Sequence, residues 1–282
     1  MYRQILSRIA AATLATTALV ACETTTEQGT VGVQRSQLIL VSSAEMEKAA
    51  ATQYTQLIST ETPKGNVNRD PKQSERVRGI AKRLIPQTAV FRKDAVDWKW
   101  EVNVLTSPEV NAWCMPGGKI AVYSGLIEKL QITDDELAAV MGHEISHALR
   151  EHGRERASQQ MAASAGASLA GAVADIFLPG SGQLATAGAG LGTQVGVLLP
   201  YSRVQETEAD RMGVELAARA GYDPRAAIVL WQKMAKLSGG SASQSSLTAF
   251  LSTHPTNEAR MKDLTEFSQK VLPLYEEARA KK

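Results

Sequence analysis

The sequence predicts an α+β fold that is mostly α-helical, with one small antiparallel sheet beside a central helix. Helical periodicity of apolar residues recurs in several stretches and is clear at residues 43–58 and 201–220. Residues 98–105 instead alternate Trp and Val with polar side chains, which is typical of a half-buried strand. A Pro-Gly-Gly turn at 116–118 precedes a second strand-like segment at 119–123, so we expect a hairpin-like pair.

Residues 1–21 are predicted to be a signal peptide. Arg3 and Arg8 give a positive start, and residues 9–20 form an apolar core that is too short to span a bilayer comfortably. The run Leu-Val-Ala-Cys at 19–22 resembles a bacterial lipobox, so we expect Cys22 to be lipidated. A plain signal peptide followed by an incidental cysteine is the alternative. Residue 23 is Glu rather than Asp, and by resemblance to enterobacterial lipoproteins this favours the periplasmic face of the outer membrane.

Residues 22–40 are predicted to be a lipidated tether, because residues 23–34 are rich in Thr, Glu, Gln and Gly, and residues 41–282 a single domain. The formal net charge is +2, and removal of Arg3 and Arg8 with the leader would leave 29 basic and 29 acidic residues. This balance argues against a nucleic-acid surface. With Cys22 acylated, the remaining cysteine, Cys114, has no intrachain partner, so no disulfide framework is expected.

Further helices are predicted at residues 73–85, 134–150, 224–237 and 256–280. Thr133 and Glu136 form a capping box that opens the second of these. Gly221 is predicted to end the 201–220 helix, and Asp223 to cap the next one.

Residues 161–199 are crowded with Ala, Gly and Ser and carry almost no charge. Two closely packed core helices are the favoured interpretation. A small-residue hairpin that covers the active site or dips into a membrane surface is the alternative. Asp175 and the many glycines argue against a transmembrane span.

Residues 143–147 have the sequence His-Glu-Ile-Ser-His, inside the predicted central helix. His143 and His147 share one helical face and can bind one metal ion, for which the ligand types favour zinc, one per chain. Glu144 can contact a water held by the ion without being a ligand. Zinc lowers the pKa of such a water towards about 7, and Glu144 would accept its proton. Two surface histidines on an ordinary helix are the alternative.

A catalytic zinc usually has three protein ligands and one open position. The metzincin pattern is excluded, because Arg150 and Gly153 stand where it needs Gly and His. His152 is out of register and is interpreted as a solvated residue at the helix end. The third ligand should then be a downstream carboxylate on another helix, and Glu206 and Asp210 share one face of the 201–220 helix.

With Glu-x-x-x-Asp on the helix after His-Glu-x-x-His, the chain resembles the HtpX-like and CaaX-prenyl-protease-type zinc metallopeptidases, a gluzincin family. Within it, the LoiP- and BepA-like periplasmic lipoproteins are the most similar members. The resemblance covers about residues 70–270 and implies a metalloprotease domain within residues 41–282. It implies that Glu206 is the third zinc ligand and that Asp210 orients a ligand imidazole.

The segment Asn111, Ala112, Trp113, followed by Met-Pro-Gly-Gly at 115–118, resembles the family's segment beside the cleft. The resemblance implies an edge strand that pairs with substrate backbone. Cys114 is interpreted as a buried thiol and not as a ligand.

Thr253, His254 and Pro255, with Arg260, resemble the family's late His-Pro motif. The resemblance implies that His254 stabilises the tetrahedral oxyanion or occupies the open zinc position at rest. An ordinary loop histidine is the alternative. Arg260 is expected to pair with an acid near the site.

The sequence thus predicts a zinc endopeptidase of the bacterial cell envelope that hydrolyses peptide bonds of unfolded or misassembled envelope proteins. A latent or non-cleaving periplasmic chaperone or assembly lipoprotein is the alternative. In both cases the expected partners are envelope proteins and, through the lipid anchor, the membrane, with no nucleic acid.

Overall fold

A computed structural model describes residues 22–163, 201–238, 250–251, 253–255 and 258–281 of the 282-residue chain. The predicted signal peptide, nearly all of the segment at 161–199 and the Gly/Ser-rich residues 239–249 lie outside the described residues. Among those described, no helix combines the length and the apolar character that crossing a bilayer requires.

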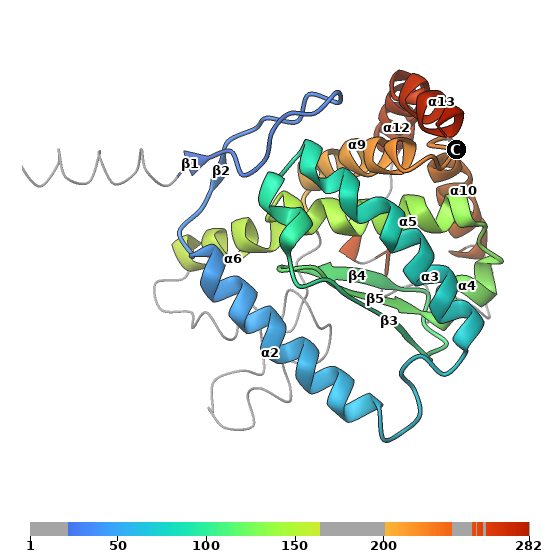
Figure 1. Cartoon of the computed structure of the whole chain (residues 1–282). Helices are drawn as coiled ribbons and strands as arrows, with labels where there is room; N and C mark the ends of the chain where they lie inside the picture. Colours follow the sequence, from blue (N-terminus) through green and yellow to red (C-terminus); the bar gives the residue numbers. More distant parts are fainter. Residues whose placement is uncertain (1–21, 164–200, 239–249, 252, 256–257, 282) are drawn as a thin grey trace, which may run out of the picture.

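The predicted α+β fold, mostly α-helical with a small sheet beside the central helix, is confirmed (Figure 1). The strands are β1 (Cys22–Glu23), β2 (Gln37–Leu38), β3 (Glu101–Leu105), β4 (Ala112–Met115) and β5 (Lys119–Tyr123). The helices are α2 (Ser43–Glu61), α3 (Pro71–Leu84), α4 (Ser124–Leu130), α5 (Asp134–Leu149), α6 (His152–Ala163), α9 (Arg203–Arg219), α10 (Ala226–Ser238), α12 (Glu258–Lys270) and α13 (Leu272–Ala280). Two 3-10 turns, η1 (Ile85–Val90) and η2 (Lys93–Asp97), join α3 to β3.

The three-stranded sheet has the order β3-β5-β4 and is mixed rather than antiparallel. The predicted hairpin-like pairing of the 98–105 strand with 119–123 is wrong, because β3 pairs with β5 in parallel. The Pro-Gly-Gly turn instead joins β4 to β5, which pair antiparallel with Ala112 opposite Val122. Within the described residues β4 has no second partner strand, so its outer side is an open edge.

Both faces of this sheet are covered. Ile120 and Val122 belong to the main core with α3 and α5, whereas Ala121 between them belongs to a second cluster with Met46 and Tyr54 of α2. This alternation is the period of two that a strand imposes. Burial on both faces explains why every residue of β4 is buried. Figure 1 shows α2 on one side of the sheet, and α5 between its other side and α9.

The helix boundaries follow local signals. Thr133 and Glu136 form the predicted capping box of α5. A second capping box, from Ser202 and Gln205, opens α9. The predicted single helix at 256–280 is two helices, because Pro273 stands at the start of α13 and cannot continue a helix from α12.

Helices α5 and α9 cross with their backbones in contact at Gly142 and Gly213. A methyl group on Gly142 would lie 2.8 Å from the carbonyl oxygen of Gly213, and one on Gly213 would lie 2.8 Å from the amide nitrogen of His143. Both distances are too short for a carbon atom. This glycine pair therefore sets how closely α9 approaches the His-Glu-x-x-His segment.

Residues 24–41 pack against the domain, so the prediction of a tether over residues 22–40 is wrong for most of its length. Val31 and Val33 are 2% and 3% exposed and lie in the main core. The backbone N–H groups of Thr30 and Val31 donate to the buried carboxylate of Glu215 on α9, at 3.1 and 3.0 Å. Composition misled the prediction because polar residues of this segment, such as Arg35 and Gln37, bond to the domain.

We expect Gly213→Ala to destabilise the fold by about 1–3 kcal/mol, because the added methyl must push α9 away from α5. Gly79→Ala is the matched control. Gly79 also lies inside a helix, α3, but a methyl there meets nothing within 4 Å. The control should be neutral or stabilising by up to about 1 kcal/mol. Denaturant unfolding of both variants checks this, and equal stability of the two would contradict the crossing constraint.

Candidate metal centre

The two histidines of the central motif point the same way from α5. His143 and His147 are 5% and 3% exposed, and their Nε2 atoms lie 3.0 Å apart. Burial of such polar rings in the core is costly unless each nitrogen has a partner. Their shared direction follows from the four-residue spacing on one helix.

Glu206, in the first turn of α9, faces this pair. Its carboxylate oxygens lie 3.6 Å from His143 Nε2 and 3.4 Å from His147 Nε2, and its side chain is fully buried. The cluster is completed by His254, so that one ligand atom from each of these four residues lies within 4.8 Å of the others. The structure therefore brings together the three predicted ligands and the late histidine.

This donor set fits zinc. Imidazole nitrogen and carboxylate oxygen are its ordinary ligands, and tetrahedral ligands at about 2.0–2.1 Å from the ion lie about 3.3 Å apart. The separations of 3.0, 3.4 and 3.6 Å within the cluster bracket that value. The buried carboxylate of Glu206 also fits a cation. Burial would raise its pKa, but the charges of His254 and Arg260 hold its pKa well below the usual range.

Glu144 stands beside the cluster without belonging to it. Its Oε1 atom is buried, has no hydrogen-bond partner among the described residues and lies 3.6 Å from Nε2 of His254. Burial raises the pKa of this carboxyl. An acceptor atom kept free at this place can take a proton from a small molecule bound next to it.

Asp210, one turn after Glu206 on α9, holds His143 from behind. Its Oδ1 lies 2.9 Å from His143 Nδ1, which is the contact that an orienting role requires. Arg260 of α12 donates to both oxygens of Asp210 and lies 2.7 Å from Glu206 Oε2. The predicted pairing of Arg260 with an acid is therefore present, with two carboxylates.

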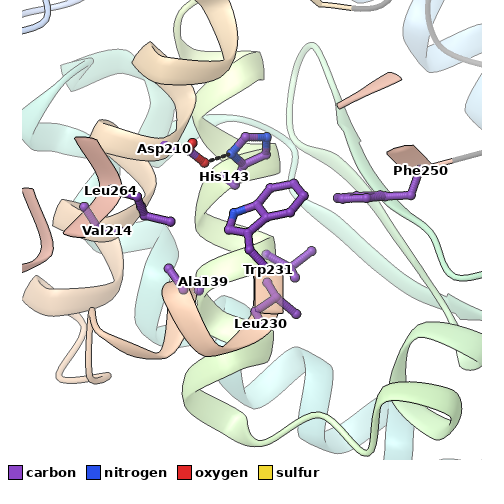
Figure 2. Close-up of a pocket in the computed structure, with 10 residues that line it drawn as sticks. Ala139, His143, Asp210, Val214, Leu230, Trp231, Phe250 and Leu264 are labelled. Carbon is purple, nitrogen blue, oxygen red and sulfur yellow. Dashed lines mark hydrogen bonds and ion pairs between the residues drawn. The ribbon is translucent and has the colours of Figure 1, made fainter. Parts of the chain in front are cut away.

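A small cavity lies beside His143 and Asp210, and both residues line it. Figure 2 shows the indole of Trp231 beside the His143 ring, with Leu230 below it and Phe250 opposite. Val214 and Leu264 close the side next to Asp210. An apolar wall of this kind excludes water and strengthens the bond between the imidazole and the carboxylate.

His254 contacts the cluster from a turn after Phe250. Its Nδ1 lies 2.9 Å from Glu206 Oε1 and 3.3 Å from His143 Nε2. The ring is 3% exposed and packs against Phe250 at 4.6 Å between centroids. The interpretation as an ordinary loop histidine is therefore wrong.

Tyr201 was missed by sequence reasoning. Its ring stacks on His147 at 3.9 Å between centroids, with the planes 25° apart. Burial raises the pKa of its hydroxyl to about 12. A tyrosine just before a helix cap carries no spacing signal, so only the folded chain could reveal it.

His152 is not a solvated residue, and that prediction is wrong. It is fully buried, with its Nδ1 2.9 Å from His147 Nδ1 and its Nε2 3.0 Å from Glu208 Oε2. Glu151 breaks the helix with a positive φ of 52° between α5 and α6, and this turns His152 back towards α5. The register argument assumed one continuous helix.

Glu208 is itself held by arginines. Arg35 Nε and Nη2 donate to its two oxygens at 3.1 and 3.0 Å, and Arg150 approaches at 3.4 Å. Burial alone would raise the pKa of Glu208, but its bonds to His152 and Arg35 and the charge of Arg150 lower it to about 2.

Asn111 directly precedes β4, the strand with the open edge, and Ala112 and Trp113 are its first two residues. Trp113 packs edge-on against Tyr54 at 5.8 Å between centroids, on the sheet face away from α5. Cys114 is buried, and burial raises its pKa well above the usual value. It is absent from the ligand cluster, and Cys22 is exposed at the start of β1.

Comparisons with known proteins agree with this site. Residues 71–268 match the description Peptidase family M48. The chain is 37% identical over 191 residues to the mitochondrial metalloendopeptidase OMA1 of Schizosaccharomyces pombe, covering 68% of this chain and 52% of that protein. It is 28% identical over 209 residues to the beta-barrel assembly-enhancing protease of Escherichia coli, covering 73% and 41%.

The mitochondrial metalloendopeptidase OMA1 of Arabidopsis thaliana is 37% identical over 183 residues, covering 64% of this chain and 34% of that protein. The matches thus span about a third to a half of these relatives. They do not separate the bacterial members from the mitochondrial ones.

We expect Arg260→Met to destabilise the metal-free protein by about 3–5 kcal/mol, because it leaves Glu206 and Asp210 buried without their cation. Added zinc should reduce this loss of stability, since the ion replaces part of the missing positive charge. Arg211→Met is the matched control. Arg211 also joins α9 to α12, through Asp263, but is 30% exposed and should cost less than about 1 kcal/mol. Similar losses in both variants would contradict the role of Arg260.

The charge of Glu208 should make stability depend on pH. Because its folded pKa lies below the ordinary value, its contribution of about 3 kcal/mol is complete above about pH 4.5 and is lost as pH falls towards about 2. The stability gap between wild type and Glu208→Gln should therefore shrink across that range. Denaturant unfolding of the metal-free proteins at several pH values measures it. A stability difference between the two proteins that stays constant across this pH range would contradict the view that Glu208 is ionised and hydrogen-bonded in the folded protein.

Proposed function

Because the chain belongs to peptidase family M48, we propose that it is a zinc endopeptidase of the bacterial cell envelope that acts on unfolded or misassembled envelope proteins. Family membership makes residues 71–268 a zinc metallopeptidase domain, which confirms the predicted enzyme class and cofactor. The HtpX-, LoiP- or BepA-like subtype, the substrate and the compartment are parts of the proposal.

The observation that carries the proposal is the buried cluster of possible metal ligands, with the unbonded carboxylate oxygen of Glu144 beside it. In our assignment His143, His147 and Glu206 hold the zinc, and Asp210 fixes the ring of His143. Bound zinc would polarise the peptide carbonyl and make water a better acid. A metal site that served stability alone would need no buried carboxylate with an unbonded oxygen, which is what Glu144 supplies.

The reaction steps of the chain's own residues follow from their positions. Glu144 takes a proton from the attacking water and can return it to the leaving amine. His254, with Nε2 3.6 Å from Glu144 Oε1, is placed to donate to the oxygen that becomes negative. The apolar side chains around Trp231 and Phe250 keep bulk water out.

Substrate binding is assigned to the open edge of β4. An extended peptide can add to such an edge as a further strand, with main-chain hydrogen bonds that do not depend on sequence. Asn111, Ala112 and Trp113 would then line its path along the edge of β4. Recognition through the backbone suits unfolded segments, because an extended chain presents its main-chain N–H and C=O groups along its whole length.

The cell envelope is proposed from the N-terminus. The leader and the lipobox-like residues favour a lipid on Cys22, which is exposed, and an anchor at the periplasmic face of the outer membrane. The name of the Escherichia coli relative, a beta-barrel assembly-enhancing protease, supports such a role. The similarity to mitochondrial relatives supports endopeptidase chemistry without a bacterial compartment.

A second candidate function is a latent enzyme or a chaperone that binds envelope proteins and rarely cleaves them. His254 favours it, because its Nδ1 lies within the ligand cluster and can take the position that substrate needs. The two candidates differ in what removal of this imidazole does.

We expect the protein without residues 1–22 to bind about one zinc per chain and to cleave casein. Glu144→Gln should bind zinc equally and lose cleavage by a factor of about 10²–10⁴, since only the proton acceptor is removed. His254→Ala should also keep zinc and should cleave more slowly if the imidazole assists the reaction. Zinc content and the cleavage rate are the two measurements.

The outcomes separate the candidates. Cleavage by His254→Ala alone would favour the latent form, and client binding that survives Glu144→Gln without loss of cellular function would favour the chaperone. A folded wild type that binds no zinc would exclude the proposal.

A further inference from the structure

The second zinc histidine has an unusual partner. Nδ1 of His143 is hydrogen-bonded to the carboxylate of Asp210. Nδ1 of His147 instead faces another imidazole nitrogen, Nδ1 of His152, at 2.9 Å. One of these two nitrogens must carry the proton and the other must accept it. The direction of this bond decides whether Nε2 of His147 has a free electron pair for a metal.

The far end of His152 settles that direction. Its Nε2 lies 3.0 Å from the carboxylate of Glu208, which can only accept. Nε2 of His152 therefore holds the proton, and in the neutral ring Nδ1 is the acceptor. His147 then donates from Nδ1, and its Nε2 is left unprotonated towards Glu206, at 3.4 Å.

This chain of bonds depends on the position of the Glu208 carboxylate. Its two oxygens accept from Nε and Nη2 of Arg35, and the same guanidinium holds Glu155 at 2.6 and 2.9 Å. Arg35 thus uses its planar donor set to lock two carboxylates at once, from α6 and α9. Arg150 contributes a weaker contact at 3.4 Å.

We propose that Arg35, which precedes the family match, is a positioning residue for the metal centre. It fixes the carboxylate of Glu208, and that carboxylate fixes the tautomer of His152. His152 in turn holds His147 with Nδ1 protonated and Nε2 directed at the metal. The inference rests on the proposed zinc site and adds that the N-terminal segment, residues 24–41, is part of it.

The test compares full-length Arg35→Gln with Arg211→Gln. Both arginines donate two hydrogen bonds to a carboxylate and are 34% and 30% exposed, but the hydrogen bonds of Arg211 go to Asp263 and not to Glu208. Arg35→Gln should weaken zinc binding by about 10-fold or more, measured by competition with a chelator. It should also shift the visible absorption of the cobalt-substituted protein, because the ring of His147 is no longer held. Arg211→Gln should change neither, and Arg35→Lys should recover part of the affinity.

A double-mutant cycle distinguishes the relay from a general loss of structure. His152→Gln should weaken zinc binding as well, and Arg35→Gln should then cause little further loss in the His152→Gln background. Additive losses, or zinc affinity and cobalt spectra like wild type in folded Arg35→Gln, would overturn the inference. If the wild type binds zinc and cleaves, and Arg35→Gln and His152→Gln bind zinc as tightly as it does, the inference fails but the proposed function stands. A wild type without zinc rejects both.

Discussion

The backbone contact between Gly142 and Gly213 is the constraint on which the metal centre depends. His143 and His147 come from α5 and Glu206 from α9, so the distances from Glu206 to the two histidines are set by how closely the two helices approach. With both glycines in place the axes can approach until main-chain atoms touch. Packed backbone does not deform gradually, so the separation is well defined before any ion arrives.

The same two helices also set the charge balance of the site. Glu208 and Asp210 are two residues apart on α9, and each supports one of the two motif histidines, directly or through His152. Each carboxylate is held by an arginine from a different part of the chain, Arg260 from α12 and Arg35 from the N-terminal segment. Buried negative charge is therefore matched on both sides of the cluster, which burial requires.

Local signals in the sequence predicted α2, α3, α5, α9 and α10, the cap of α5 and the spacing of His143, Glu144 and His147, because these depend on neighbours within a turn. Glu206 needed a family resemblance, since nothing in a single helix says which partner it faces. The parallel pairing of β3 with β5 could not be predicted from the alternation of apolar and polar residues. Alternation shows which face of the sheet a side chain occupies, but not which strand lies next to it. His152 was misjudged because its position depends on a chain reversal at Glu151, and Arg35 was missed because its partners come from distant segments.

The short link between Cys22 and the packed N-terminal segment has a consequence for how substrates are met. Thr26 is already buried and only residues 23–25 separate it from Cys22, which gives a reach of about 14 Å at most. If Cys22 carries a lipid, the domain cannot diffuse through the volume next to the bilayer and is confined to its surface. Encounters then become two-dimensional, and polypeptides that linger at the membrane are met far more often than those in the open compartment.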